Sequence, residues 1–124
     1  MKLSSEEFEK LVQDAIEEIP RPLRNYLDNV IVQVAPMPSG DDLAEFEADD
    51  RTELLGLYHG TPLTERDVEF AGITPDQITI FQRNIERICR SRREVVEQIR
   101  TTVLHEIGHH FGLDENDLFD VGFE

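Results

Sequence analysis

The chain has 124 residues and a formal net charge of −15, from 12 basic and 27 acidic side chains. This charge disfavours nucleic acid and anionic membrane surfaces, whose phosphates it would repel, and no stretch approaches the ~20 apolar residues of a membrane span. A single cysteine, Cys89, cannot form an internal disulfide, and the first residues lack the apolar stretch of a secretory signal. We therefore expect one cytoplasmic domain over residues 1–124. The sequence does not predict its oligomeric state.

A helix is expected from about Ser5 to Ile19. Ser4 and Glu7 have the spacing of a capping box. The apolar residues recur at spacings of three and four, which predicts one buried face: Phe8, Leu11, Val12, Ala15, Ile16 and Ile19. Two prolines follow and end the helix, and a short helical turn is expected around residues 23–27. We interpret this element as a helix that packs on a sheet.

Three strands are expected. Residues 30–35 are β-branched and indicate a buried strand, residues 54–59 form a second with Gly56 marking a bulge or a close approach, and residues 77–82 alternate as a third. An acidic run occupies residues 41–50. It lacks the D-x-D-x-D-G pattern of a calcium loop, which favours a solvated loop. Residues 61–76 are expected to form a connecting loop.

A short helix over residues 84–90 is expected to place Ile85 and Ile88 inward. Six of the twelve basic residues fall between positions 83 and 100, and we interpret them as partners of the many carboxylates rather than as a site for acidic ligands. Ser91 and Glu94 form a second capping-box pattern, which predicts a long helix over about 92–111. A short terminal helix is expected at residues 116–121.

The long helix carries the pattern H-E-x-x-H-x-x-G-x-x-E over residues 105–115. On a helix, His105 and His109 stack on one face, one turn apart, where two imidazoles can reach one metal ion. Glu106 then lies beside the ion, where a carboxylate can take a proton from a water molecule that the metal holds. Gly112 can end the helix and bring Glu115 within reach as a third ligand. Two histidines and one carboxylate leave one position open, which is typical of catalytic zinc.

Helical phase separates the candidate ligands from the core. At about 100° per residue, one apolar stripe forms: Val96, Ile99, Val103, Ile107 and Phe111. His105 and His109 fall well away from it and are expected to face a cleft. His110 falls back on the stripe, which favours a partly buried, hydrogen-bonded histidine over a ligand. His59 is far from the motif in sequence and is interpreted as structural.

The motif resembles that of the zincin metallopeptidases, with Glu115 where the similar metzincin pattern usually has His or Asp. More closely, the run TVLHEIGHHFG at 102–112 resembles a small bacterial "minimal zincin" family of zinc peptidases, and so do LLGLY at 54–58 and PLTER at 62–66. The resemblance implies a zinc-dependent peptidase-like domain with His105, His109 and Glu115 as ligands and Glu106 as general base. One departure is that no methionine, and hence no Met-containing turn, follows the motif.

These residues support a mechanism in which zinc activates a water molecule, Glu106 accepts its proton, and a peptide carbonyl is attacked. Tyr58 is a candidate for stabilising the oxyanion, and a tyrosine at the edge of the core is the favoured alternative. Asp114 and Asp117 could orient a ligand or cap a turn. In zincins an edge strand pairs with the substrate backbone. A zinc-binding regulatory or interaction module with little turnover, and a zinc amidase on small molecules or cell-wall fragments, stay open as alternative functions.

The elements together predict an α+β fold of zincin-like type. A small mixed sheet of three or four strands is expected to pack on an N-terminal helix and on the long C-terminal helix that binds the metal.

Overall fold

The computed structural model describes residues 1–40, 54–60 and 75–112. Its elements, in chain order, are α1 (Ser5–Glu17), α2 (Arg21–Arg24), η1 (Asn25–Leu27), β1 (Val30–Ala35), β2 (Gly56–His59), β3 (Asp76–Phe81), α5 (Gln82–Ile88) and α6 (Arg92–Phe111). The acidic run at 41–50, most of the connecting loop, the terminal helix at 116–121, and Asp114, Glu115 and Asp117 lie outside the described residues.

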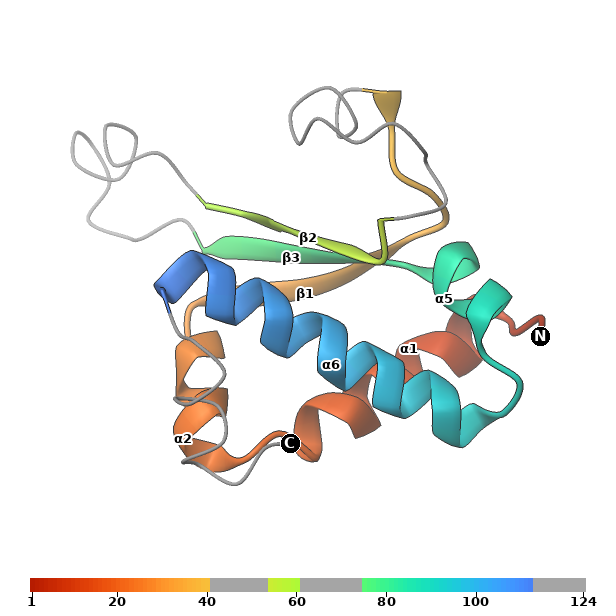
Figure 1. The fold of residues 1–124 in the computed structure, drawn as a ribbon, viewed down its shortest axis with the longest axis horizontal. Coiled ribbons are helices and arrows are strands. Elements are labelled where there is room, and N and C mark those ends of the chain that lie inside the picture. The colour runs from red at the N-terminus through yellow and green to blue at the C-terminus, as the bar shows by residue number, and fades with distance from the viewer. Residues whose placement is uncertain (41–53, 61–74, 113–124) are drawn as a thin grey trace.

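The three strands form one mixed sheet in the order β1-β3-β2. β1 pairs with β3 in parallel, and β2 pairs with β3 antiparallel, with Tyr58 opposite Ile78. The two long helices lie on the same side of this sheet, and β2 runs above α6 (Figure 1). The α+β prediction is therefore confirmed, with a mixed sheet over an N-terminal and a long C-terminal helix.

Strand alternation gives the sheet one apolar face. Ile78 and Ile80 of β3 are fully buried against the helices, and Tyr58 of β2 lies on the same face. On the opposite face, the side-chain amide of Gln33 donates to Gln77 and to Thr79 at 3.1 and 3.0 Å. The helices thus cover the apolar face of the sheet, as the sequence predicts for α1.

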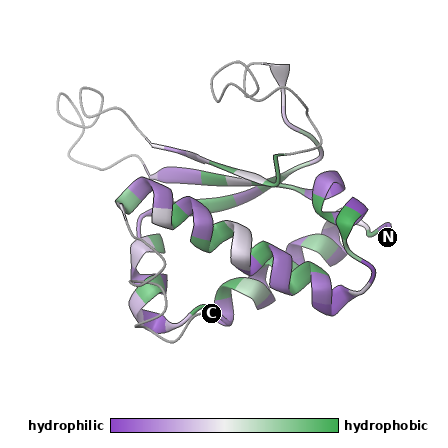
Figure 2. Cartoon of the chain, in the orientation of Figure 1, coloured by the Kyte–Doolittle hydropathy of each residue, from purple (hydrophilic) through white to green (hydrophobic). Residues whose placement is uncertain are grey.

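Both long helices begin at a serine cap. Ser4 and Glu7 form the full capping box at α1, whereas at α6 the Ser91 hydroxyl accepts from the Glu94 N–H. Hydrophilic and hydrophobic residues alternate around α6, as in a helix that buries one face and exposes the other (Figure 2). Its buried face includes Ile99, Val103 and Ile107, each with 0% exposure. This confirms the predicted stripe from Val96 to Ile107 but not its last member, since Phe111 at the end of the helix is 41% exposed.

Ion pairs join α1 to α6 across their outer surface. The Glu18 carboxylate accepts two hydrogen bonds from Arg93, at 2.7 and 2.8 Å, and a third from Arg100 at 3.0 Å. Arg92 pairs with Glu7 near the start of α1. These contacts agree with the interpretation of the arginine-rich stretch as a set of partners for carboxylates.

Two further predictions about burial are wrong. β1 is expected to be buried, but it lies at an edge of the described sheet, its inward residues are half-buried and Ile31 is 46% exposed. Ile88 is expected to point inward, but it is 51% exposed because α5 ends there and Cys89, the next residue, takes the buried position.

Among the described helices, none has the length and apolar character that crossing a membrane requires.

Candidate metal centre

The long helix places the candidate ligands at its C-terminal end. α6 runs unbroken for 20 residues from the Ser91 cap to Phe111. Gly112 then adopts a left-handed conformation, with φ 69° and ψ 30°, and its N–H donates to the Gly108 carbonyl. A side chain with a Cβ is strained in this conformation. The glycine of the motif therefore ends the helix where the sequence predicts.

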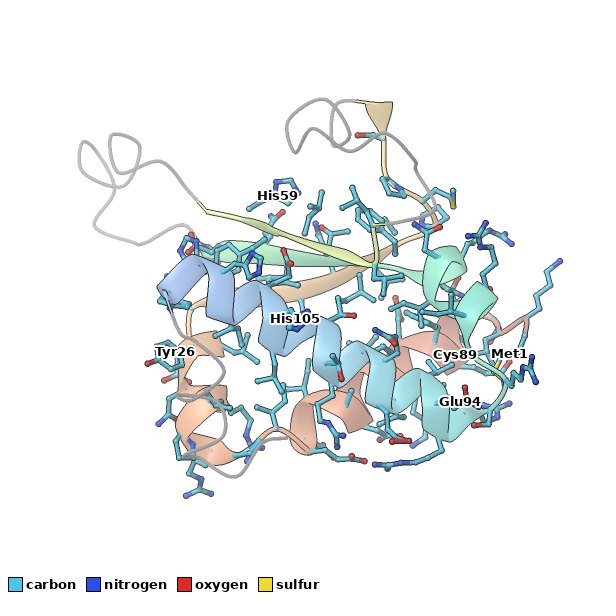
Figure 3. The ribbon with its side chains drawn as sticks, in the orientation of Figure 1. Met1, Tyr26, His59, Cys89, Glu94 and His105 are labelled. Atoms are coloured by element: carbon cyan, nitrogen blue, oxygen red, sulfur yellow. The ribbon has the colours of Figure 1, made fainter. Side chains whose placement is uncertain are left out.

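His105 and His109 lie on the exposed face of α6, as their helical phase predicts. Both residues are exposed, and their ring centroids are 6.4 Å apart with the ring planes tilted by 35°. The side chain of His105 projects from α6 away from the buried stripe (Figure 3). The pair is therefore accessible to an ion from solvent, and its nitrogen donors suit zinc.

Glu106 is half-buried between α6 and β2. Its Oε1 atom accepts a hydrogen bond of 2.9 Å from the backbone N–H of Tyr58. Burial raises the pKa of the Glu106 carboxyl above its ordinary value, while the Tyr58 N–H and the nearby rings of His109 and His105 act in the opposite direction. This carboxylate is held in place by a backbone donor, beside the histidine pair.

A surface pocket opens between β2 and the end of α6. Its wall is formed by Leu54, Gly56, Leu57, Tyr58, Glu106, His109 and His110. The general-base candidate and one candidate ligand therefore share a pocket that borders the outer edge of β2.

Tyr58 is the most extensively contacted residue of this pocket wall. Its hydroxyl donates to the buried Asp76 carboxylate at 2.7 Å, and its ring stacks on His110 with centroids 3.9 Å apart and planes 14° apart. The hydroxyl proton is therefore donated to Asp76. This favours the structural alternative for Tyr58 over a role in stabilising an oxyanion.

Sequence reasoning missed Asp76. It lies at the start of β3 with 7% exposure, and the His110 Nε2 atom is 3.9 Å from its Oδ2 atom. The strand alternation offers a signal, since Asp76 falls in phase with the inward residues Ile78 and Ile80. A carboxylate in that phase predicts a buried acceptor that needs a donor.

The other two histidines flank the site: His110 lines the same pocket as His109, and His59 lies near enough to the Glu106 carboxyl to lower its pKa. His110 is expected to be partly buried; its side chain is 39% exposed but stacks on Tyr58 and contacts the edge of the Phe111 ring. His59 alternates with Tyr58, so it lies on the face of β2 that points away from α6, as Figure 3 shows. Both arrangements agree with structural roles.

The candidate ligands within the described residues suit a zinc ion. His105 and His109 present two imidazole rings at helical spacing, and a carboxylate is a common third ligand of catalytic zinc. Glu115, the expected third ligand, lies outside the described residues. Within residues 1–40, 54–60 and 75–112, no cluster of three His, Cys, Asp or Glu residues gathers around one point, so the described part of the chain contributes at most a two-histidine pair.

Comparison with known proteins adds one finding. A family model described as zincin-like metallopeptidase matches residues 27–122, which include β1 to β3 and all of α6. A search of curated proteins finds no match.

Proposed function

This chain belongs to the zincin-like metallopeptidases, and from that premise we propose that it hydrolyses peptide bonds with zinc bound by His105, His109 and Glu115. The observation that carries the proposal is the placement of Glu106. Glu106 directly follows His105 in the sequence. Its carboxylate shares a pocket with His109 and is oriented by the Tyr58 N–H. This is the position that a general base of a metallopeptidase requires.

Zinc, when bound, lowers the pKa of water and polarises a carbonyl group. The chain supplies the proton transfers. Glu106 accepts the proton of the attacking water and passes it to the leaving nitrogen. Its partial burial raises the carboxyl pKa toward the working pH, which makes the second transfer easier.

The outer edge of β2 is the proposed binding surface for the peptide backbone. Among the described strands β2 pairs only with β3. Because backbone groups alternate along an antiparallel strand, the Tyr58 N–H that reaches Glu106 lies on the edge away from β3. A substrate strand that pairs with this edge beside Tyr58, whose N–H remains bonded to Glu106, would pass close to that carboxylate.

We further propose that the domain comprises residues 1–124 and works in the cytoplasm. The buried Cys89 thiol, which is free among the described residues, agrees with a reducing compartment.

The test combines metal analysis with peptide digestion. Protein produced without a chelating tag is expected to contain one zinc per chain and to cleave members of a broad peptide library. Replacing a general base removes its proton-transfer contribution, so Glu106→Gln should lower turnover roughly 10²- to 10⁴-fold while zinc content is unchanged. Glu97→Gln, an exposed change on the same helix, is the matched control and should retain full activity.

Ligand variants test the metal assignment separately. His105→Ala, His109→Ala and Glu115→Ala are each expected to lose zinc, whereas His59→Ala and His110→Ala retain it. Stoichiometric zinc without cleavage of any peptide would favour the zinc-binding module over the enzyme. Cleavage confined to small amides would favour the amidase, and full zinc occupancy in Glu115→Ala would remove that residue from the ligand set.

A further inference from the structure

Tyr58 is held by three contacts, two with α6 and one with β3. Its N–H donates to Glu106 of α6, its hydroxyl donates to Asp76 of β3, and its ring stacks on His110. The residue is 8% exposed. These contacts determine the position of its backbone as well as that of its ring.

Near Tyr58, every second residue along the strand lies over every fourth residue of α6. A Cβ placed on Gly56 would lie 2.7 Å from Thr102 Cγ2, and one on Gly60 would lie 3.3 Å from His110 Cε1. Positions 56 and 58 of β2, and position 60 just after it, therefore lie over positions 102, 106 and 110 of α6. Two residues of a strand advance about 6.7 Å and four residues of a helix about 6.0 Å, so the two spacings nearly match.

We propose that Tyr58 and Asp76 are positioning residues for Glu106. Asp76 holds the Tyr58 hydroxyl, which fixes the strand so that the Tyr58 N–H orients one oxygen of the Glu106 carboxylate. This role in turnover rests on the proposed function. The positioning itself is a property of the metal-free chain and can be measured without activity.

The physical basis is the cost of breaking the buried hydrogen bond between the Tyr58 hydroxyl and Asp76. A buried carboxylate and a buried hydroxyl each need a partner, and they satisfy one another here. A backbone donor to a carboxylate is a charge-assisted bond, which strongly prefers one orientation of the acceptor. Without the hydroxyl contact, the Tyr58 ring loses its hydrogen bond to β3 and is held less tightly by its ring contacts with His110 and Phe111, so the Glu106 carboxylate gains freedom to turn.

The primary test uses Tyr58→Phe, with Tyr26→Phe as its matched control. Tyr26 is the only other tyrosine, is 36% exposed and keeps its ring contact with Phe111 in the variant. In metal-free protein, hydrogen exchange of the Tyr58 amide should speed up roughly 10-fold in Tyr58→Phe relative to that of the Ile80 amide in β3, and should not change in Tyr26→Phe. The ratio between the two amides removes any effect of global stability.

Asp76 is tested with two replacements. Asp76→Ala removes the acceptor and should reproduce the exchange effect of Tyr58→Phe, whereas Asp76→Asn keeps an acceptor oxygen and should restore most of the protection. The double variant Tyr58→Phe/Asp76→Asn should be no worse than Tyr58→Phe alone, because both changes affect the same bond.

The turnover test compares zinc-loaded proteins at equal zinc content. Tyr58→Phe should lower kcat roughly 10- to 100-fold with KM nearly unchanged, and Tyr26→Phe should match the parent. Unchanged Tyr58 amide protection in both Tyr58→Phe and Asp76→Ala would overturn the positioning role. Loss of protection with an unchanged kcat would overturn its link to catalysis. A parent protein without peptidase activity would defeat the proposed function alone, since the exchange result stands independently.

Discussion

At the scale of single residues, Cys89 shows how burial controls reactivity. The thiol lies just beyond α5 with 5% exposure, and burial, followed by the negative charge of Glu94, raises its pKa above the ordinary value. Because the thiolate is the reactive form, we expect thiol-specific reagents to label native protein at pH 8 at least about tenfold more slowly than denatured protein. Absorbance of the released reagent measures this rate.

The control for this prediction is Cys89→Ala, which should give no label in either state. Equal rates of labelling in native and denatured protein would show that the thiol is accessible and that its burial in the structure is wrong.

The sequence predicts the residues of the site better than their contacts. The phases of His105 and His109 follow from the helical period alone, and the structure places both on the exposed face. The hydrogen bond between Tyr58 and Glu106 joins residues 48 positions apart. Such a contact depends on how β2 packs over α6, which no local pattern contains. The same holds for the pairing of Tyr58 with Asp76.

At the scale of elements, the close approach of β2 to α6 predicts the effect of a single methyl group. Gly56→Ala would place a Cβ 2.7 Å from Thr102 Cγ2 and 3.1 Å from the Thr79 carbonyl oxygen. The first contact is too short and the second is tight, so β2 must shift relative to both α6 and β3. We expect the variant to lose about 1–3 kcal/mol of unfolding free energy, measured by urea denaturation.

A compensating change tests the cause. Thr102→Ser removes Cγ2 but keeps the hydroxyl that accepts from Gln98, so the double variant Gly56→Ala/Thr102→Ser should regain part of the loss. Gly40→Ala, where a Cβ would meet no atom within 4 Å, serves as the control. Additive losses in the double variant would contradict a steric origin.

The helices could be predicted more closely than the strands. Ser91 and Gly112 mark the two ends of α6 by chemistry that is local to the chain, a side-chain cap and a left-handed glycine. The burial of β1 depends on its neighbours in the sheet. Residues 30–35 have the composition of a buried strand but form an edge of the described sheet, because strand order is decided by pairing between distant segments.

At the scale of the whole molecule, Glu18 links the two long helices and makes their packing sensitive to pH. Arg93, and then Arg100, hold the pKa of the Glu18 carboxyl below its ordinary value. A lowered pKa in the folded state adds stability above the unfolded pKa, and this stability is lost as the pH falls through the folded value. We expect Glu18→Gln to cost about 1 kcal/mol or less at pH 7, since the pair is partly exposed.

The matched control is Glu17→Gln, which removes a charge from the same end of α1 without breaking these ion pairs. Thermal unfolding across pH should show the Glu18→Gln deficit at pH 7 shrinking to nothing in acid, and shrinking in high salt. A deficit that stays constant down to acidic pH would mean that the carboxylate charge is not its source.

The near match of strand and helix spacing also limits the size of the site. Each step of two strand residues exceeds four helix residues by about 0.7 Å, so the offset grows along the contact. Over the three contact positions 56, 58 and 60, the offset stays below the width of an atom. A longer β2 would drift out of phase with α6 and bring side chains into collision with the helix. For the proposed peptidase, a floor built this way can follow the helix for only a few turns around Glu106, and a larger binding surface would need loops beyond the strand.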